Sequence, residues 1–139
     1  MDILNKVFDF TGKSNLITLD DLNPNKYILD DEQTTNQYNL WIAVNQLRLA
    51  YNKPMIVTSG VRSKEDQQRI NPKAPLSKHI IGAAVDFSDP NGDLKKFVKE
   101  NNYKILIDNG LWMEAASSTP NWLHVQVFPP KSGKREFLP

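Results

Sequence analysis

Apolar residues recur at helical spacing in the second quarter of the chain. Four of them lie three or four positions apart: Leu40, Val44, Leu47 and Tyr51. This spacing predicts an amphipathic helix over about 35–51. Lys53 and Pro54 end the helix, because proline cannot continue its hydrogen bonding. The β-branched run at 55–58 then predicts a short strand, which stops at Ser59-Gly60.

A second helix and a buried strand follow. Ser63 has the character of an N-cap, with the acidic residues Glu65 and Asp66 in the first turn, so we expect a helix to about Arg69. Two prolines in the segment 71–75 predict a loop. The apolar run at 83–87 predicts a buried strand.

The second half of the chain predicts one more helix and a pair of strands. Asp93 opens a helix in which three apolar residues share a face: Leu94, Phe97 and Val98. Residues 104–107 are apolar enough to pack, but their pattern fits a helix and a strand equally. Residues 111–114 and 122–127 predict two antiparallel strands, joined by 115–121.

These elements indicate an α+β fold, with a small antiparallel sheet flanked by helices. No repeat or linker divides the chain, so we expect one domain over 1–139. Residues 1–33 have little periodicity and are expected to form an N-terminal extension, with a short helix at 2–8 and a turn at 23–25. Residues 129–139 are expected to be a basic, solvated tail.

The composition excludes several classes of protein. The chain has 139 residues, a formal net charge of +1 and no cysteine. A nearly neutral chain has no long-range field for nucleic acid or anionic membranes, and the absence of cysteine excludes disulfides and thiolate chemistry. We see no signal peptide and no membrane span. We therefore expect a soluble protein, a monomer, made in a bacterial host cytoplasm.

The candidate chemistry centres on the two histidines of the chain, His79 and His124. His79 lies before a strand that carries Asp86, and His124 lies on a second predicted strand. Because side chains alternate along a strand, Asp86 points to the opposite face from Val85 and Phe87. Two adjacent strands can therefore present Asp86 and His124 to the same side. Two imidazoles and a carboxylate suit zinc with one open position, which is the arrangement of a catalytic site.

The motifs around these residues resemble a known family. Ser77, His79, Gly82, Ala84 and Asp86 form the pattern Ser-x-His-x-x-Gly-x-Ala-x-Asp, and Trp122-Leu123-His124 follows as Trp-x-His. Together with Ser-Gly-x-Arg-Ser at 59–63, they resemble the zinc peptidases that cut bacterial cell-wall peptides. That group includes D-Ala-D-Ala carboxypeptidases and dipeptidases and the L-Ala-D-Glu endolysins of bacteriophages, and it shares its fold with the hedgehog signalling domain. The resemblance covers roughly 40–128.

The resemblance implies roles for four residues. His79, Asp86 and His124 would bind Zn²⁺, and Arg62 would hold a carbonyl or carboxylate of the substrate. A guanidinium beside a metal can also stabilise an oxyanion, which makes Arg62 a candidate on chemical grounds alone.

The expected general base departs from the family pattern. Many members have an acid three residues before the second histidine, where this chain has Asn121, which cannot accept a proton. Glu114 is the best substitute, because it ends a strand predicted to pair with the His124 strand. It also belongs to a Gly-Leu-Trp-x-Glu element at 110–114 that resembles small phage members. We further expect the Ser77 hydroxyl to bond to the substrate or to a metal ligand, and Gln126 to contact the substrate.

The main hypothesis is a zinc peptidase that hydrolyses an amide in bacterial peptidoglycan peptides. It would be a phage or prophage lysin that acts at the cell wall after release, or a virion-associated enzyme. Asn121 keeps an alternative open, which is a zinc-containing module that binds wall peptides or a protein without catalysis. A second alternative is a virion structural protein in which the metal only braces the fold.

Overall fold

The computed structural model describes residues 16–139, in which five strands form one sheet. In spatial order these are β1 (Val57–Ser59), β2 (Ala84–Ser88), β4 (Trp122–Gln126), β3 (Trp112–Glu114) and β5 (Glu136–Phe137). Every pairing is antiparallel except that of β3 with β5. The α+β class and the largely antiparallel sheet are therefore confirmed. The helix predicted at 2–8 lies outside the described residues.

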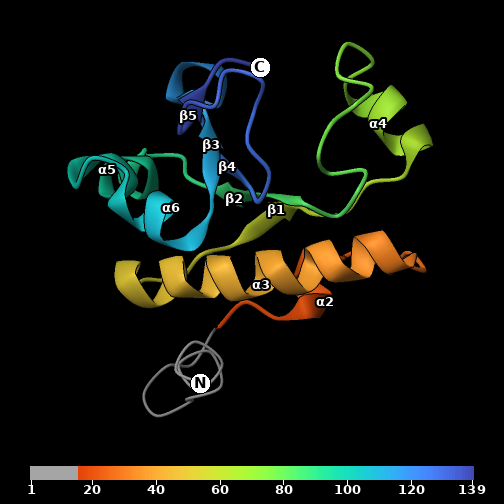
Figure 1. Cartoon of the computed structure of the whole chain (residues 1–139), viewed down its shortest axis with the longest axis horizontal. Helices are drawn as coiled ribbons and strands as arrows, with labels where there is room; N and C mark the ends of the chain where they lie inside the picture. The colour runs from red at the N-terminus through yellow and green to blue at the C-terminus, as the bar shows by residue number, and fades with distance from the viewer. Residues whose placement is uncertain (1–15) are drawn as a thin grey trace.

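Helices surround this sheet, as Figure 1 shows. They are α2 (Leu19–Leu22), α3 (Asp31–Tyr51), α4 (Lys64–Ile70), α5 (Asp93–Glu100) and α6 (Lys104–Asn109), with a 3₁₀ turn at Ala116–Ser118. In Figure 1, α3 runs along one side of the sheet, while α5 and α6 lie towards one end and α4 towards the other. Within residues 16–139, no helix has the length and apolar character needed to cross a membrane.

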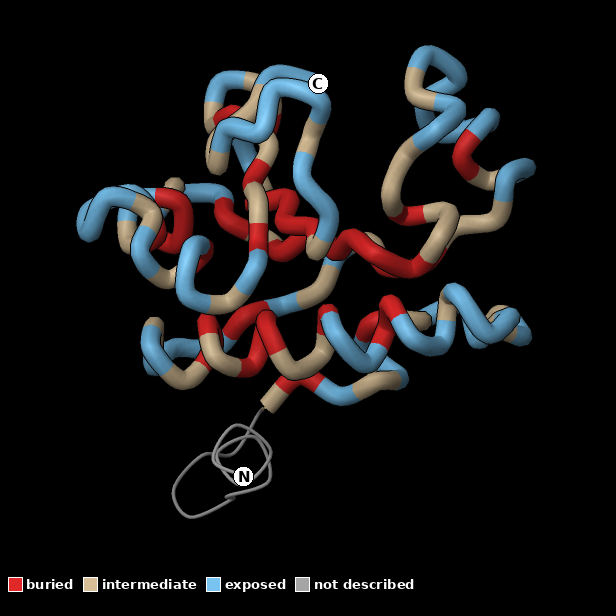
Figure 2. Tube along the Cα trace, in the orientation of Figure 1, coloured by how far each residue is buried: buried red, intermediate tan, exposed pale blue. Residues whose placement is uncertain are grey.

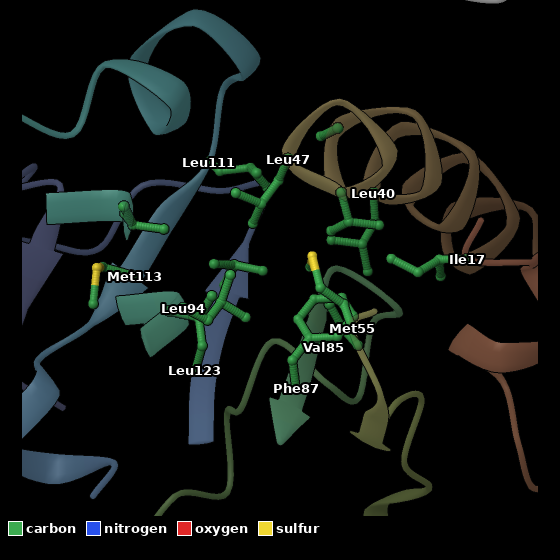
Figure 3. Packing of buried hydrophobic residues seen from close by; sticks show 14 of the residues in the cluster. Ile17, Leu40, Leu47, Met55, Val85, Phe87, Leu94, Leu111, Met113 and Leu123 are labelled. Atoms are coloured by element: carbon green, nitrogen blue, oxygen red, sulfur yellow. The ribbon is translucent and has the colours of Figure 1, made fainter. Parts of the chain in front are cut away.

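Strand alternation separates the core from the candidate site. Strands β2 and β4 pair so that Asp86 lies opposite His124. Their neighbours Val85, Phe87, Leu123 and Val125 belong to the hydrophobic core, and Figure 3 shows several of these side chains packed beside α3. Because successive side chains point to opposite faces, the residues between them point away from this core.

Helix α3 closes the core with its apolar side chains Leu40, Val44 and Leu47, which are fully buried. Ile17 and Leu22 join the same cluster, so residues 16–22 are part of the folded unit although they lie in the range expected to be an extension. Figure 2 shows the buried residues concentrated in the strands and on α3, whereas α4 and the loop after it are mostly exposed.

Two helices begin or end where local hydrogen bonding dictates. The helix expected from about 35 begins at Asp31, because Asp30 and Gln33 form a reciprocal capping box that apolar periodicity does not reveal. The ambiguous segment at 104–107 is helical, and Gly110, with a φ of 63°, ends α6 in the left-handed conformation.

The prediction of a solvated tail over 129–139 is wrong for Arg135 to Phe137. Strand β5 pairs with β3, and the carbonyls of Arg135 and Phe137 accept hydrogen bonds from the amides of Met113 (2.8 Å) and Ala115 (2.6 Å). A two-residue strand is too short to show the alternation by which strands are predicted.

Candidate metal centre

The structure brings three buried side chains together, from a loop and two adjacent strands. Asp86 Oδ1 lies 2.9 Å from His124 Nδ1 and 3.3 Å from His79 Nε2. One potential ligand atom from each residue lies within 4.8 Å of the other two. Two imidazole nitrogens and one carboxylate oxygen at such spacing can bind one divalent ion and leave a coordination position open.

The hydrogen bond of His79 away from the centre determines which nitrogen can bind a metal. His79 Nδ1 lies 2.9 Å from the carbonyl oxygen of Gly60, which can only accept a hydrogen bond. Nδ1 therefore carries the proton, and in the neutral ring Nε2 directs its lone pair towards Asp86. Such an outer partner is typical of a metal-binding histidine.

His124 is oriented in the same way by Gln126. The Gln126 amide donates from Nε2 to the carbonyl of Phe128 (2.9 Å), so its Oε1 is the end that faces His124 Nε2, also at 2.9 Å. His124 Nε2 must then be the donor, and its Nδ1 is the atom left to face Asp86. The two histidines thus offer different ring nitrogens to one centre.

Burial and hydrogen bonding shift the pKa values of these groups in different directions. Burial lowers the pKa of His79 below 6.5, and the bond to Asp86 only partly opposes it. Burial also acts to lower the pKa of His124, but the bond to Asp86 and the charge of that carboxylate outweigh it and raise the pKa. Burial alone would raise the pKa of Asp86, yet the bonds from both histidines lower it. Asp86 is therefore an anion, as a carboxyl group must be to bind a metal.

The loop that carries His79 is held by amide side chains of α3. Gln33, Asn36 and Gln37 donate hydrogen bonds to three successive carbonyls, those of Ile80, Ile81 and Gly82, at 2.8 to 2.9 Å. Gly82 itself has a φ of 74°, and a Cβ there would lie 3.1 Å from the backbone oxygen of Gln33. Gly82 thus permits both the turn and the close approach of the loop to α3.

Gly60 supports the same histidine from the other side. A Cβ at this position would lie 2.1 Å from the backbone oxygen of Leu22, so no larger residue fits without a shift of the backbone. The contact lets the chain pass close to α2, where Val61 N donates to Leu22 O at 3.0 Å. The Gly60 carbonyl that orients His79 depends on this close approach.

Arg62 lies at the edge of the centre in a fixed position. Its Nη2 lies 3.3 Å from Asp86 Oδ2, Nε and Nη2 both donate to Ser59 Oγ, and Nη1 donates to Gln67 Oε1 at 2.9 Å. Arginine has five N–H groups, and four of them have acceptors within the described part of the chain. The fifth, on Nη1, suits a single acceptor such as a carbonyl oxygen.

Glu114 lies on the same face of the sheet as Asp86 and His124. Met113 pairs with Val125 in the β3–β4 ladder, so Glu114 is level with His124, and both point away from the core. Burial raises the pKa of Glu114, as does the charge of Asp86, whereas the charges of His124 and Arg62 lower it. The charges of Asp86, His124 and Arg62 thus all act on the pKa of Glu114.

The remaining candidate residues, Ser77, Gln126 and Asn121, are hydrogen-bonded to other parts of the protein. Ser77 Oγ accepts a hydrogen bond from the backbone amide of His79 at 3.3 Å, which stabilises the loop. Gln126 is buried, and both ends of its amide are bonded to His124 and Phe128. Asn121 is exposed, and its backbone oxygen accepts from Asp89 N at 2.8 Å.

Several supporting residues were not identified from the sequence. They are Gly60, Ser59 and Gln67, and the α3 amides Gln33, Asn36 and Gln37. Ser59 and Gly60 belong to a motif that was noted for Arg62, so a signal existed for them. The α3 amides gave no such signal, because Gln33 lies before the helix expected from about 35, and the burial of Asn36 and Gln37 is evident only in the structure.

A centre of two histidines and one aspartate on a largely antiparallel sheet is typical of a metallohydrolase. The chain belongs to the peptidase M15 family, whose model matches residues 17–125. The match includes the three potential ligands, Arg62 and Glu114, and it begins within the segment expected to be an extension. The comparison with curated proteins gave no match, and neither did the comparison with solved structures.

Proposed function

We propose that this protein is a zinc peptidase that hydrolyses an amide bond in the short peptides of bacterial peptidoglycan. The observation that supports it most strongly is the pair of outer hydrogen bonds, from His79 to Gly60 and from His124 to Gln126, which leave one nitrogen of each ring facing Asp86. The peptidase M15 family membership supports the reaction class.

The donor set fits zinc. His79 Nε2, His124 Nδ1 and one oxygen of Asp86 would hold the ion. Bound zinc supplies Lewis acidity, which lowers the pKa of a water molecule and polarises an amide carbonyl. The side chains of this protein then supply the proton transfers and the orientation.

Glu114 is the residue positioned to take the proton of the attacking water and deliver it to the leaving amine. Its elevated pKa favours this double role, because a base with a pKa closer to neutrality also returns the proton more readily. The remaining N–H of Arg62 would donate to the substrate carbonyl oxygen, on which negative charge develops.

The substrate and setting follow from the resemblance of the motifs. Ser-x-His-x-x-Gly-x-Ala-x-Asp and the Gly-Leu-Trp-Met-Glu element support a cell-wall peptide as substrate and a phage or prophage lysin as the source. A single available N–H on Arg62 suits an internal carbonyl better than a bidentate grip on a terminal carboxylate, which supports cleavage within the peptide.

The experiment is digestion of purified peptidoglycan, with mass spectrometry of the fragments and a count of new amino groups. We expect Glu114→Gln to lower kcat by about 10²-fold to 10⁴-fold, the usual contribution of a general base, with zinc content unchanged. Glu100→Gln, an exposed glutamate on α5, is the matched control. Full activity in Glu114→Gln would remove Glu114 from the mechanism, and zinc binding without release of amino groups by the unmodified protein would support a binding module instead.

A further inference from the structure

Strand β5 lies beyond the segment matched by the family model and borders the candidate site. It pairs with β3 so that Phe137 is the partner of Glu114. Paired residues of adjacent strands have side chains on the same face, so Phe137 lies on the face that carries Glu114 and His124.

Phe137 contacts a potential metal ligand directly. Its ring packs edge-to-face against the His124 ring, with centroids 6.2 Å apart and an interplanar angle of 85°. The His79 ring lies near the same imidazole, at 5.1 Å between centroids. His124 is therefore confined by ring contacts as well as by its bonds to Asp86 and Gln126.

The backbone of β5 also fixes the position of Glu114. The amides on either side of it, those of Met113 and Ala115, donate to the carbonyls of Arg135 and Phe137 at 2.8 and 2.6 Å. On one side of β3, the residues before and after Glu114 are thus hydrogen-bonded to the segment 135–137. On the other side, β3 is paired with β4.

Side chains on both faces anchor this short strand. The Arg135 guanidinium lies over the Trp112 ring, 4.2 Å from its centroid, which is favourable cation–π geometry. Glu136 accepts hydrogen bonds from the Tyr103 hydroxyl and from Ala116 N (2.9 Å), and it lies 3.6 Å from Lys99 Nζ. With these contacts, residues 135–137 are packed against the protein and do not form a solvated tail.

We propose that β5 is an active-site strand and that Phe137 is a positioning residue, which sets the orientation of the His124 ring and the place of Glu114. The inference rests on the proposed function for its kinetic test, and it has a second test that needs only metal binding. The nearest control in sequence is Leu138, which is 77% exposed.

The test compares Phe137→Ala, Phe137→Tyr and Leu138→Ala. We expect Phe137→Ala to lower kcat by about 10-fold to 100-fold, the range typical of residues that orient metal ligands, with KM changed far less. Phe137→Tyr should restore kcat, because it keeps the ring, and Leu138→Ala should match the unmodified protein. If Phe137→Ala does not fold, Phe137→Leu serves in its place, because it keeps apolar volume but has no ring.

The second readout is the visible spectrum of the protein loaded with Co²⁺, which reports the geometry of the ligands without turnover. We expect the absorption bands of Phe137→Ala to shift and those of Leu138→Ala to stay in place. A lower melting temperature in Phe137→Ala with unchanged kcat and spectrum would overturn the inference. Absence of both metal binding and hydrolysis in the unmodified protein would instead overturn the proposed function, and this inference with it.

Discussion

The two histidines of the candidate centre are positioned in different ways. His124 lies on β4, where the register with β2 places it opposite Asp86. His79 lies on a loop, where its position depends on the Gly60 carbonyl and on α3 amides that bind the following three residues. A strand-borne ligand is fixed by a repeating backbone pattern, whereas a loop-borne ligand needs individual contacts from distant parts of the chain.

The two regions should therefore differ in how well they tolerate the loss of a side-chain contact. The ladder between β2 and β4 has five paired positions, so the loss of one side-chain contact leaves the register of His124 intact. In the loop at 79–82, the carbonyls of residues 80–82 each accept one hydrogen bond from an α3 amide, and the loss of one such bond leaves that carbonyl without this partner. We therefore expect His79 to be the more easily displaced ligand.

Asp86 joins the two regions, and its replacement has the largest expected effect. Asp86→Asn removes the negative charge that contacts both histidines and Arg62, so we expect metal affinity to fall by more than about 100-fold, beyond the usual cost of an outer-sphere change. Chelator competition with Zn²⁺ measures it.

Asp89→Asn is the matched control, because Asp89 is also buried but caps α5 through the amides of Leu94 and Lys95. It should lower the melting temperature and leave metal affinity unchanged. Equal metal affinity in both variants would contradict the assignment of Asp86 as a ligand.

The elements that the sequence predicts well are those whose patterns are local. The apolar alternation of β2 and β4 predicts the face on which Asp86 and His124 lie, and the helical spacing from Leu40 to Tyr51 predicts most of α3. The motif of His79, Asp86 and His124 indicates that the three belong together, because a shared ion requires them to meet.

The contacts that the sequence does not predict are those between distant segments. Nothing local at Gly60 indicates that its carbonyl orients His79, and nothing at Gln126 distinguishes a support of His124 from a substrate contact. The sequence does not predict strand β5 for a related reason, since its two residues pair only because β3 offers them an edge. These features depend on tertiary proximity, which one sequence does not encode in a readable pattern.

Gly60→Ala tests whether His79, the potential ligand on the loop, is displaced more easily than His124. A Cβ here would overlap the Leu22 carbonyl, so we expect a loss of about 1–3 kcal/mol in stability, as for other overpacked sites. Displacement of the Gly60 carbonyl should also free the His79 ring and lower metal affinity by about 10-fold.

Gly110→Ala is the control, because a Cβ there meets no atom within 4 Å but the φ of 63° strains it. Its melting temperature should fall through backbone strain alone, by an amount that corresponds to about 1 kcal/mol, with metal affinity intact. If Gly60→Ala binds metal as tightly as Gly110→Ala, the Gly60 carbonyl does not orient His79.

The smallest expected effect is a difference between the pKa values of His79 and His124 in the metal-free protein. The pKa of His79 lies below 6.5 and that of His124 above it, because burial prevails at His79 while the Asp86 and Gln126 bonds prevail at His124. As pH falls through 6.5, His79 resists protonation and folding stability is lost. As pH rises through the pKa of His124, the stability from its protonated form is lost, so the two contributions have opposite signs and act on opposite sides of pH 6.5.

Histidine ring resonances in NMR spectra measure both midpoints, and His79→Gln assigns the two signals. Zinc should remove both titrations, because the ion takes the place of the proton on His79 Nε2 and on His124 Nδ1, and metal affinity should therefore decline as pH falls through the pKa of His124. Coincident midpoints near 6.5 would mean that strand and loop hold their histidines in equivalent surroundings, contrary to the contacts that distinguish them.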